Sequence, residues 1–158
     1  MTDTMAETTD ETAIQMGEIQ NSLGFLLRVA QIQTFERFFE SLGSYGLKPG
    51  EFTVLWVIGL NPGMRQGTIA RHLSIKPAHM TKLVGRLIKQ GFVAREQHTE
   101  DRRAVRISLT EQGRDFVAEN KGAFLMQNAH ERNQLSPEEM ETLIGLLQKL
   151  TGRDTHAS

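Results

Sequence analysis

The sequence lacks cysteine altogether, and its 158 residues include only four prolines, one tryptophan and one tyrosine. The absence of cysteine excludes disulfides, thiolate nucleophiles, cysteine zinc sites and thiol redox sensing. No apolar run approaches the roughly 18 residues that a membrane span needs. The N-terminal stretch MTDTMAETTDET is acidic and polar, unlike a secretory signal. We therefore expect a cytoplasmic protein with no membrane segment.

Common catalytic and metal-binding motifs are also missing. We find neither a G-x-S-x-G nucleophile elbow nor a paired-carboxylate cleft, and GLNPGMRQGT lacks the Lys-Ser/Thr ending of a phosphate loop, so it is interpreted as a turn between helices. His130 and Glu131 begin an H-E-x-x-H motif, but Gln134 stands where the second histidine is needed. The sequence therefore predicts no enzyme, no cofactor and no metal site.

The charge is distributed unevenly along the chain. The formal net charge is only −1, yet residues 1–20 carry five acids and no Lys or Arg, whereas residues 62–107 carry ten bases and three acids, a local charge of +7. A basic segment in a neutral protein is typical of a surface that faces a polyanion such as nucleic acid. A solvated surface explains such a run as well, and charge alone does not separate the two interpretations.

Apolar spacing predicts a mainly α-helical chain with one short β-hairpin. The polar sequence Ser136-Pro137-Glu138-Glu139 forms a capping box that should open the last helix. Alternation of apolar and polar residues in AVRISL predicts a strand. Helices are expected at 12–43, from Pro49 to about 60, at 66–73, 77–90 and 111–131, and after 136, with strands at 92–96 and 104–109.

This order of elements is that of a winged helix-turn-helix. A short helix, a tight turn and an amphipathic helix with basic outer residues precede a hairpin whose loop carries Asp101, Arg102 and Arg103. An α-helix fits the major groove of DNA, and arginine is attracted to the negative potential of a narrow minor groove. The pattern therefore predicts a helix and a wing that contact DNA together.

From about Leu23 to Leu150 the chain resembles the MarR (multiple antibiotic resistance regulator) family of bacterial transcription factors. The resemblance rests on LKPGEFTVLWVIGLNPG, on TIARHLSIKPAHMTKLVGRLIKQGFVAR and above all on the wing signature DRRAVRISLTEQG. Gly85-Arg86-Leu87 departs from the Asp-Arg-Leu of many relatives, which removes an acid that could pair with the wing. The implied organisation is a disordered acidic tail at 1–11, dimerisation helices at 12–45 and 111–152, a winged lobe at 48–110 and a disordered tail at 153–158.

The resemblance implies a homodimeric repressor that binds an operator and is released by a small molecule. In the second helix of the motif and the turn before it, we expect base-edge contacts from Ala78, His79, Thr81 and Lys82, and phosphate contacts from Ser74, Lys76 and Arg86. In the wing, Asp101 is expected to orient Arg103, and Arg102 and Arg103 are expected to contact DNA. Simple solvation is the other interpretation of each of these residues. For the pair Asp101 and Arg103, a hairpin-stabilising ion pair is the alternative.

Relatives in this family usually hold their ligand where the dimerisation helices meet the winged lobe. The candidate residues here are Phe25, Arg28, Phe35 and Phe39 in the first helix and Trp56 in the second. The family resemblance implies that the effector is an aromatic carboxylate or its CoA thioester. Ordinary core packing is the alternative role of these aromatics. A winged-helix module that binds an acidic protein, without sequence-specific DNA binding, is the alternative function.

Overall fold

The computed structural model describes residues 14–96, 105–125 and 135–153, and the chain divides between Phe35 and Glu36 into two units. The fold is mainly α-helical, as the sequence predicts. The elements in chain order are the 3-10 helix η1 (Gly17–Asn21), α1 (Leu23–Leu42), the 3-10 helix η2 (Gly43–Tyr45), α2 (Pro49–Leu60), β1 (Met64–Arg65), α3 (Gln66–His72), α4 (Pro77–Lys89), β2 (Val93–Glu96), β3 (Arg106–Leu109), α5 (Glu111–Leu125) and α6 (Pro137–Leu150).

Two expected helices have different bounds in the structure. The helix expected over 12–43 begins only at Leu23, because Ser22 takes an extended backbone and its hydroxyl accepts a hydrogen bond from the Phe25 N–H at 3.3 Å. A serine in this position caps a helix and so defines its start. The helix expected over 111–131 is described as α5 up to Leu125, and the rest of that range lies outside the described residues.

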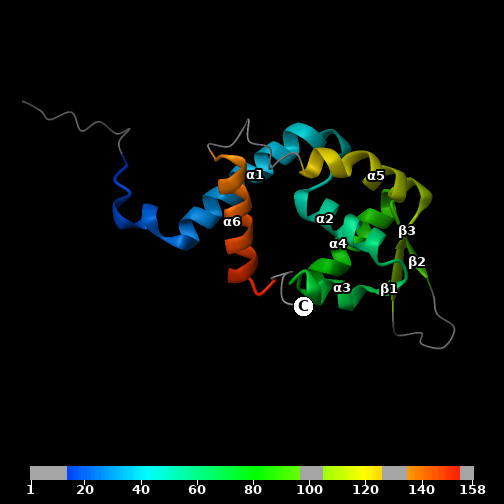
Figure 1. Cartoon of the computed structure of the whole chain (residues 1–158). Helices are drawn as coiled ribbons and strands as arrows, with labels where there is room; N and C mark the ends of the chain where they lie inside the picture. The colour runs from blue at the N-terminus through cyan, green and yellow to red at the C-terminus, as the bar shows by residue number, and fades with distance from the viewer. Residues whose placement is uncertain (1–13, 97–104, 126–134, 154–158) are drawn as a thin grey trace, which may run out of the picture. The chain divides into compact units, whose positions relative to one another are not determined.

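The winged lobe contains a third strand that the sequence interpretation missed. The strands β2 and β3 pair antiparallel as predicted, and β1 adds to the other edge of β3, so the order is β1-β3-β2 (Figure 1). Met64 lies opposite Ile107, within the stretch interpreted as a plain turn. A two-residue strand has no periodicity of its own, and its pairing depends on a partner more than forty residues away.

The core lies between α2, α4, the sheet and α5, all in the second unit. Each element contributes side chains of which almost no surface is exposed. The core must therefore fix α4 against the helices and strands that surround it, because tightly packed interiors tolerate little displacement. The largest fully buried side chains are Phe38, Leu42, Leu47, Phe52, Val54, Leu55, Ile58, Met80, Val84, Leu87 and Ile107.

Thr110, between β3 and α5, forms hydrogen bonds to the two residues that precede β2. The Thr110 hydroxyl donates to the Gly91 carbonyl at 2.6 Å and accepts from the Gly113 N–H at 3.0 Å, which caps α5. The Thr110 N–H donates to the Phe92 carbonyl at 3.0 Å. A Cβ atom at Gly113 would meet the same Phe92 carbonyl oxygen, so the position has no room for a side chain. These contacts explain the Leu-Thr-x-x-Gly spacing in physical terms.

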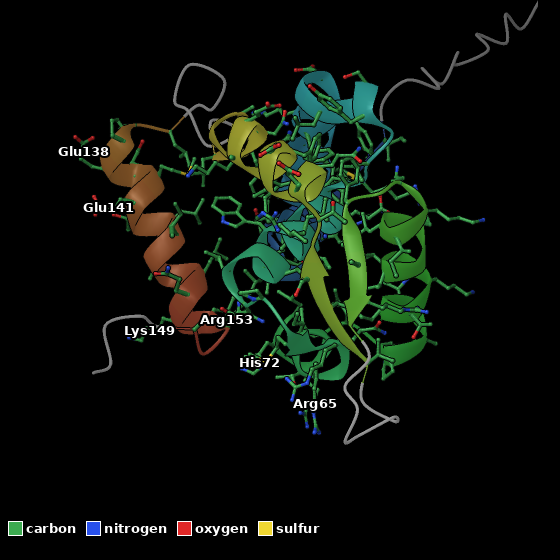
Figure 2. All side chains as sticks on the ribbon, turned by 90° about the vertical axis from the view of Figure 1, so that its right-hand side faces the viewer. Arg65, His72, Glu138, Glu141, Lys149 and Arg153 are labelled. Atoms are coloured by element: carbon green, nitrogen blue, oxygen red, sulfur yellow. The ribbon has the colours of Figure 1, made fainter. Side chains whose placement is uncertain are left out.

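Helix α6 begins with the predicted capping box and has no buried residue among those that the structure describes. The Glu139 N–H donates to the Ser136 hydroxyl at 3.3 Å, and the Ser136 N–H donates to the Glu139 carboxylate at 2.8 Å. Beyond its last turn, Arg153 donates to the carbonyl of His72, the last residue of α3, at 2.6 Å (Figure 2). An arginine at a helix C-terminus satisfies a free carbonyl and favours the negative end of the helix dipole.

Gly113→Ala is expected to lower the free energy of unfolding by about 1–3 kcal/mol, the usual cost of overpacking a filled interior. Gly122→Ala in the same helix is the matched control, because a Cβ atom there meets nothing within 4 Å. That control should raise stability by up to about 1 kcal/mol through helix propensity. Urea unfolding followed by circular dichroism measures both, and equal effects of the two substitutions would contradict the steric account.

Candidate nucleic-acid interface

Helix α4 turns one face to the core and a polar face to solvent. Pro77 occupies its first turn, where the missing N–H costs no hydrogen bond. The buried stripe consists of Met80, Leu83, Val84 and Leu87, as its spacing predicts. The expected DNA-contacting residues at its N-terminal end are all exposed: Lys76, Ala78, His79, Thr81 and Lys82. The structure therefore brings these candidates together on one accessible end of α4.

The turn between α3 and α4 has a left-handed residue at its centre. Ser74 has a φ of 55°, and its N–H donates to the Arg71 carbonyl at 3.1 Å. The next residue, Ile75, donates its N–H to the Ala70 carbonyl at 2.8 Å. These bonds fold the chain sharply enough to place α4 directly after α3, with the Ser74 side chain exposed at the turn.

The Thr81 hydroxyl is already engaged within the lobe. It donates to the Pro77 carbonyl at 3.0 Å and accepts from the Gln66 side-chain amide at 3.3 Å. Gln66 opens α3, so this bond links the two helices of the motif. The spacing of residues in the sequence does not predict this hydrogen bond between Gln66 and Thr81.

Arg86 also has intramolecular partners. Its guanidinium forms an ion pair with Glu51 of α2 at 3.0 Å and lies 3.4 Å from the Gly46 carbonyl. The phosphate contact expected for Arg86 stays a prediction at this point. Glu51 itself was missed by the sequence interpretation, since an acid in the first turn of a helix is ordinary and nothing local indicates its burial.

The base of the hairpin is fixed by a further arginine. Arg106 is half-buried and donates to the Gly63 carbonyl at 2.9 Å, while the Gly63 N–H donates to the Ser108 hydroxyl at 2.8 Å. The turn before β1 is thereby attached to β3. The expected wing residues Asp101, Arg102 and Arg103 lie outside the described residues.

The candidate ligand residues fall in both units of the chain. In the first unit, Phe25 is half-buried, Phe35 is exposed and Arg28 donates to Gln31 at 3.4 Å. In the second unit, Phe39 and Trp56 both join an aromatic cluster. The ring centroids are 5.8 Å apart for Phe39 and Phe38, 6.3 Å for Trp56 and Phe52, and 5.9 Å for Trp56 and Phe124.

Phe124 of α5 also belongs to this aromatic cluster, although the sequence did not indicate it as a candidate ligand residue. It stacks on Phe52 with centroids 4.9 Å apart and meets Phe38 at 6.1 Å. The sequence interpretation treated this helix as charged and loosely amphipathic, which concealed the residue. Its distance of eight positions from the buried Phe116 is the signal that places both on one helix face.

Two negative findings concern the described residues only. Within residues 14–96, 105–125 and 135–153, no group of three or more His, Cys, Asp or Glu is arranged to hold a metal ion. Over the same ranges, no helix has both the length and the apolar character that crossing a membrane requires.

Comparison with known proteins supports a single family. The family model for MarR matches residues 47–105. A Thauera aromatica protein named as a transcriptional regulatory protein for the hcr operon is 32% identical over 140 residues, which cover 88% of this chain and 84% of that protein.

Solved structures agree with this result. The transcriptional repressor CouR bound to a 23-mer DNA duplex is 28% identical, with a TM-score of 0.80 over 89% of this chain and 99% of that one. CouR bound to p-coumaroyl-CoA is 27% identical, with a TM-score of 0.76 over 88% and 98%. The chain shares its fold with these proteins over most of its length, and it belongs to the MarR family of transcriptional regulators.

Proposed function

We propose that this MarR-family regulator is a ligand-responsive repressor that binds a pseudo-palindromic operator as a homodimer. The observation that carries the proposal is the exposed polar end of α4 beside a hairpin, in a chain similar over 89% of its length to a repressor bound to duplex DNA. Two lobes related by a two-fold axis would contact half-sites about one helical turn apart.

The proposed contacts divide into base readers and phosphate holders. Ala78 suits the methyl group of thymine, and His79 and Lys82 have polar groups that can bond to base edges. Ser74 and Lys76 lie at the turn and at the N-cap of α4, where side chains suit phosphates. Arg102 and Arg103 in the wing would contact the minor groove and phosphates, with Asp101 orienting Arg103.

Exposed apolar surface supports the homodimer. Helix α6 leaves Leu143 at 40%, Leu146 at 61% and Leu150 at 57% exposure. The first unit, taken by itself, also exposes large apolar side chains along η1 and α1. Contiguous apolar surface of this kind indicates an interface. The exposed large apolar residues of the first unit are Ile14, Met16, Ile19, Leu23, Leu26, Leu27, Ile32 and Phe35.

The proposed effector is an aromatic carboxylate or its CoA thioester. Support comes from the CouR relative bound to p-coumaroyl-CoA. On the chain itself, the aromatic rings of Phe39 and Trp56 could stack on such a ligand. For the first unit, the roles expected of Phe25, Arg28 and Phe35 stay predictions from the family resemblance.

Sequence-specific binding is tested by titrating a fluorescent duplex from the region upstream of the gene, beside a scrambled duplex, at several salt concentrations. We expect a clear preference for the upstream duplex. Affinity should fall by about three to five decades between 50 and 200 mM salt if 6–10 phosphates are neutralised. Arg103→Ala should weaken binding. Equal affinity for both duplexes would refute the proposal and favour a protein partner for the basic segment.

Charge on the apolar face of α6 should dissociate the dimer. Leu143→Glu combined with Leu146→Glu places two carboxylates in the proposed interface, where burial without a partner is costly. Gln148→Glu, on the opposite face of the helix, is the matched control. Sedimentation equilibrium should give a monomer for the double variant and a dimer for the control. An unchanged dimer in the double variant would remove α6 from the interface.

The effector class is tested with p-coumaroyl-CoA, p-coumarate and CoA as separate probes. The single tryptophan, Trp56, reports binding through its fluorescence. We expect one of the aromatic probes to quench Trp56 and to weaken binding to the upstream duplex by about 5–150-fold, the usual range of coupling between two sites. CoA alone is the control. If all three probes leave both fluorescence and DNA affinity unchanged, this effector class is wrong.

A further inference from the structure

A buried carboxylate connects the recognition helix α4 to the first turn of α2. The side chain of Glu51 is only 5% exposed, and one of its oxygens lies 3.0 Å from a guanidinium nitrogen of Arg86. Burial of an ionised carboxylate is costly unless the charge is paired and hydrogen-bonded. Arg86 supplies that opposite charge from the third turn of α4.

The same ion pair holds the chain that leads into α2. The second oxygen of Glu51 accepts the Lys48 N–H at 2.8 Å, which satisfies a free N–H at the start of the helix. The other terminal nitrogen of Arg86 donates to the Gly46 carbonyl at 3.4 Å. Gly46 has a φ of 66°, a left-handed conformation that favours glycine. Both carboxylate oxygens and both terminal guanidinium nitrogens are therefore engaged within the lobe.

This geometry leaves little positive charge on Arg86 for DNA. The Arg86 side chain is 46% exposed, but its charge is balanced by Glu51, whereas the exposed Lys76 and Lys82 on the same helix have no carboxylate partner within residues 14–96, 105–125 and 135–153. For Arg86 to bind a phosphate instead, its guanidinium would have to leave a buried carboxylate unpaired. Removal of its partner leaves the charge of a buried carboxylate uncompensated, which is unfavourable.

We propose that Arg86 is a positioning residue that sets the orientation of α4, and that operator specificity depends on its pairing with Glu51. The proposal rests on the proposed function, because it concerns how α4 reads an operator. Hydrogen bonds to base edges tolerate little displacement, so a shifted α4 loses contacts to the correct bases. Attraction to phosphates is sequence-independent and survives such a shift.

The test compares Arg86→Gln with the double variant Glu51→Gln/Arg86→Gln, and uses Lys76→Gln as the phosphate-contact control. Affinities for the upstream and scrambled duplexes are measured over a range of salt, per mole of active protein and below the unfolding temperature. For Arg86→Gln we expect the preference for the upstream duplex to fall by about tenfold or more, equivalent to 1.4 kcal/mol. The dependence of log affinity on log salt should keep its slope.

The double variant should regain most of the preference, because it removes the buried charge and keeps an amide oxygen for the Lys48 N–H. Lys76→Gln should weaken both duplexes equally and reduce the slope by about 0.9, the value for one lost phosphate contact. If Arg86→Gln behaves like Lys76→Gln, Arg86 is a phosphate contact and the proposal is wrong. If it lowers only thermal stability, with preference and slope unchanged, its role is structural and the proposal is also wrong.

The wild-type arm separates this inference from the proposed function. If the wild-type protein shows no preference between the two duplexes, operator recognition itself fails. In that case a double-mutant cycle on urea unfolding still tests the pairing. Coupling between Glu51→Gln and Arg86→Gln would show that the pair exists without a role in specificity, which also overturns the proposal.

Discussion

The Phe92 carbonyl joins the strands of the winged lobe to the first turn of α5. It accepts the Thr110 N–H at 3.0 Å, and its oxygen occupies the space where a side chain at Gly113 would lie. The Thr110 hydroxyl closes the same junction through the Gly91 carbonyl. Because the end of β3, the start of β2 and the first turn of α5 meet here, rotation of α5 must displace the base of the hairpin. Closely packed interiors shift between discrete arrangements rather than deform smoothly.

A second constraint concerns how the positive charge is used. The segment 62–107 carries a local charge of +7 by sequence, but Arg86 is paired with a carboxylate and Arg106 is directed to the Gly63 carbonyl. The lysines of α4 are exposed, as is nearly half of the Arg86 side chain, but the lysines have no carboxylate partner among the described residues. Arginine suits the internal role because its planar fork bonds in fixed directions, whereas lysine is a point charge on a flexible stem. Arginine is thus used for contacts that fix the lobe, and lysine is used on the exposed surface of α4.

Much of this fold could be predicted from the sequence because its signals are local. Pro77 and the Ser136 capping box define the starts of α4 and α6, and apolar spacing defines their length. The strand β1 could not be predicted, since Met64 pairs with Ile107 across a long stretch of chain. Glu51 could not be predicted for the same reason: its burial depends on Arg86, 35 positions away. The residues expected to contact DNA are exposed at one end of α4, and their contact with DNA stays a prediction. The bond between Thr81 and Gln66 could not be predicted, because it depends on tertiary packing.

The pairing of Glu51 with Arg86 also explains why a polar contact stands in a position that an apolar one could occupy. The buried apolar stripe of α4 already holds the helix against the core, and the contact between Arg86 and Glu51 adds a directional restraint at its third turn. Arg86 and Glu51 meet through one nitrogen–oxygen contact of 3.0 Å, and their other terminal atoms bond to the Gly46 carbonyl and the Lys48 N–H, so the pair is tied to fixed points at the start of α2. Desolvation of the Glu51 carboxylate offsets part of the attraction, so the gain lies in orientation more than in stability. If α4 presents base-reading side chains, as proposed above, orientation is the property on which their hydrogen bonds to the bases depend.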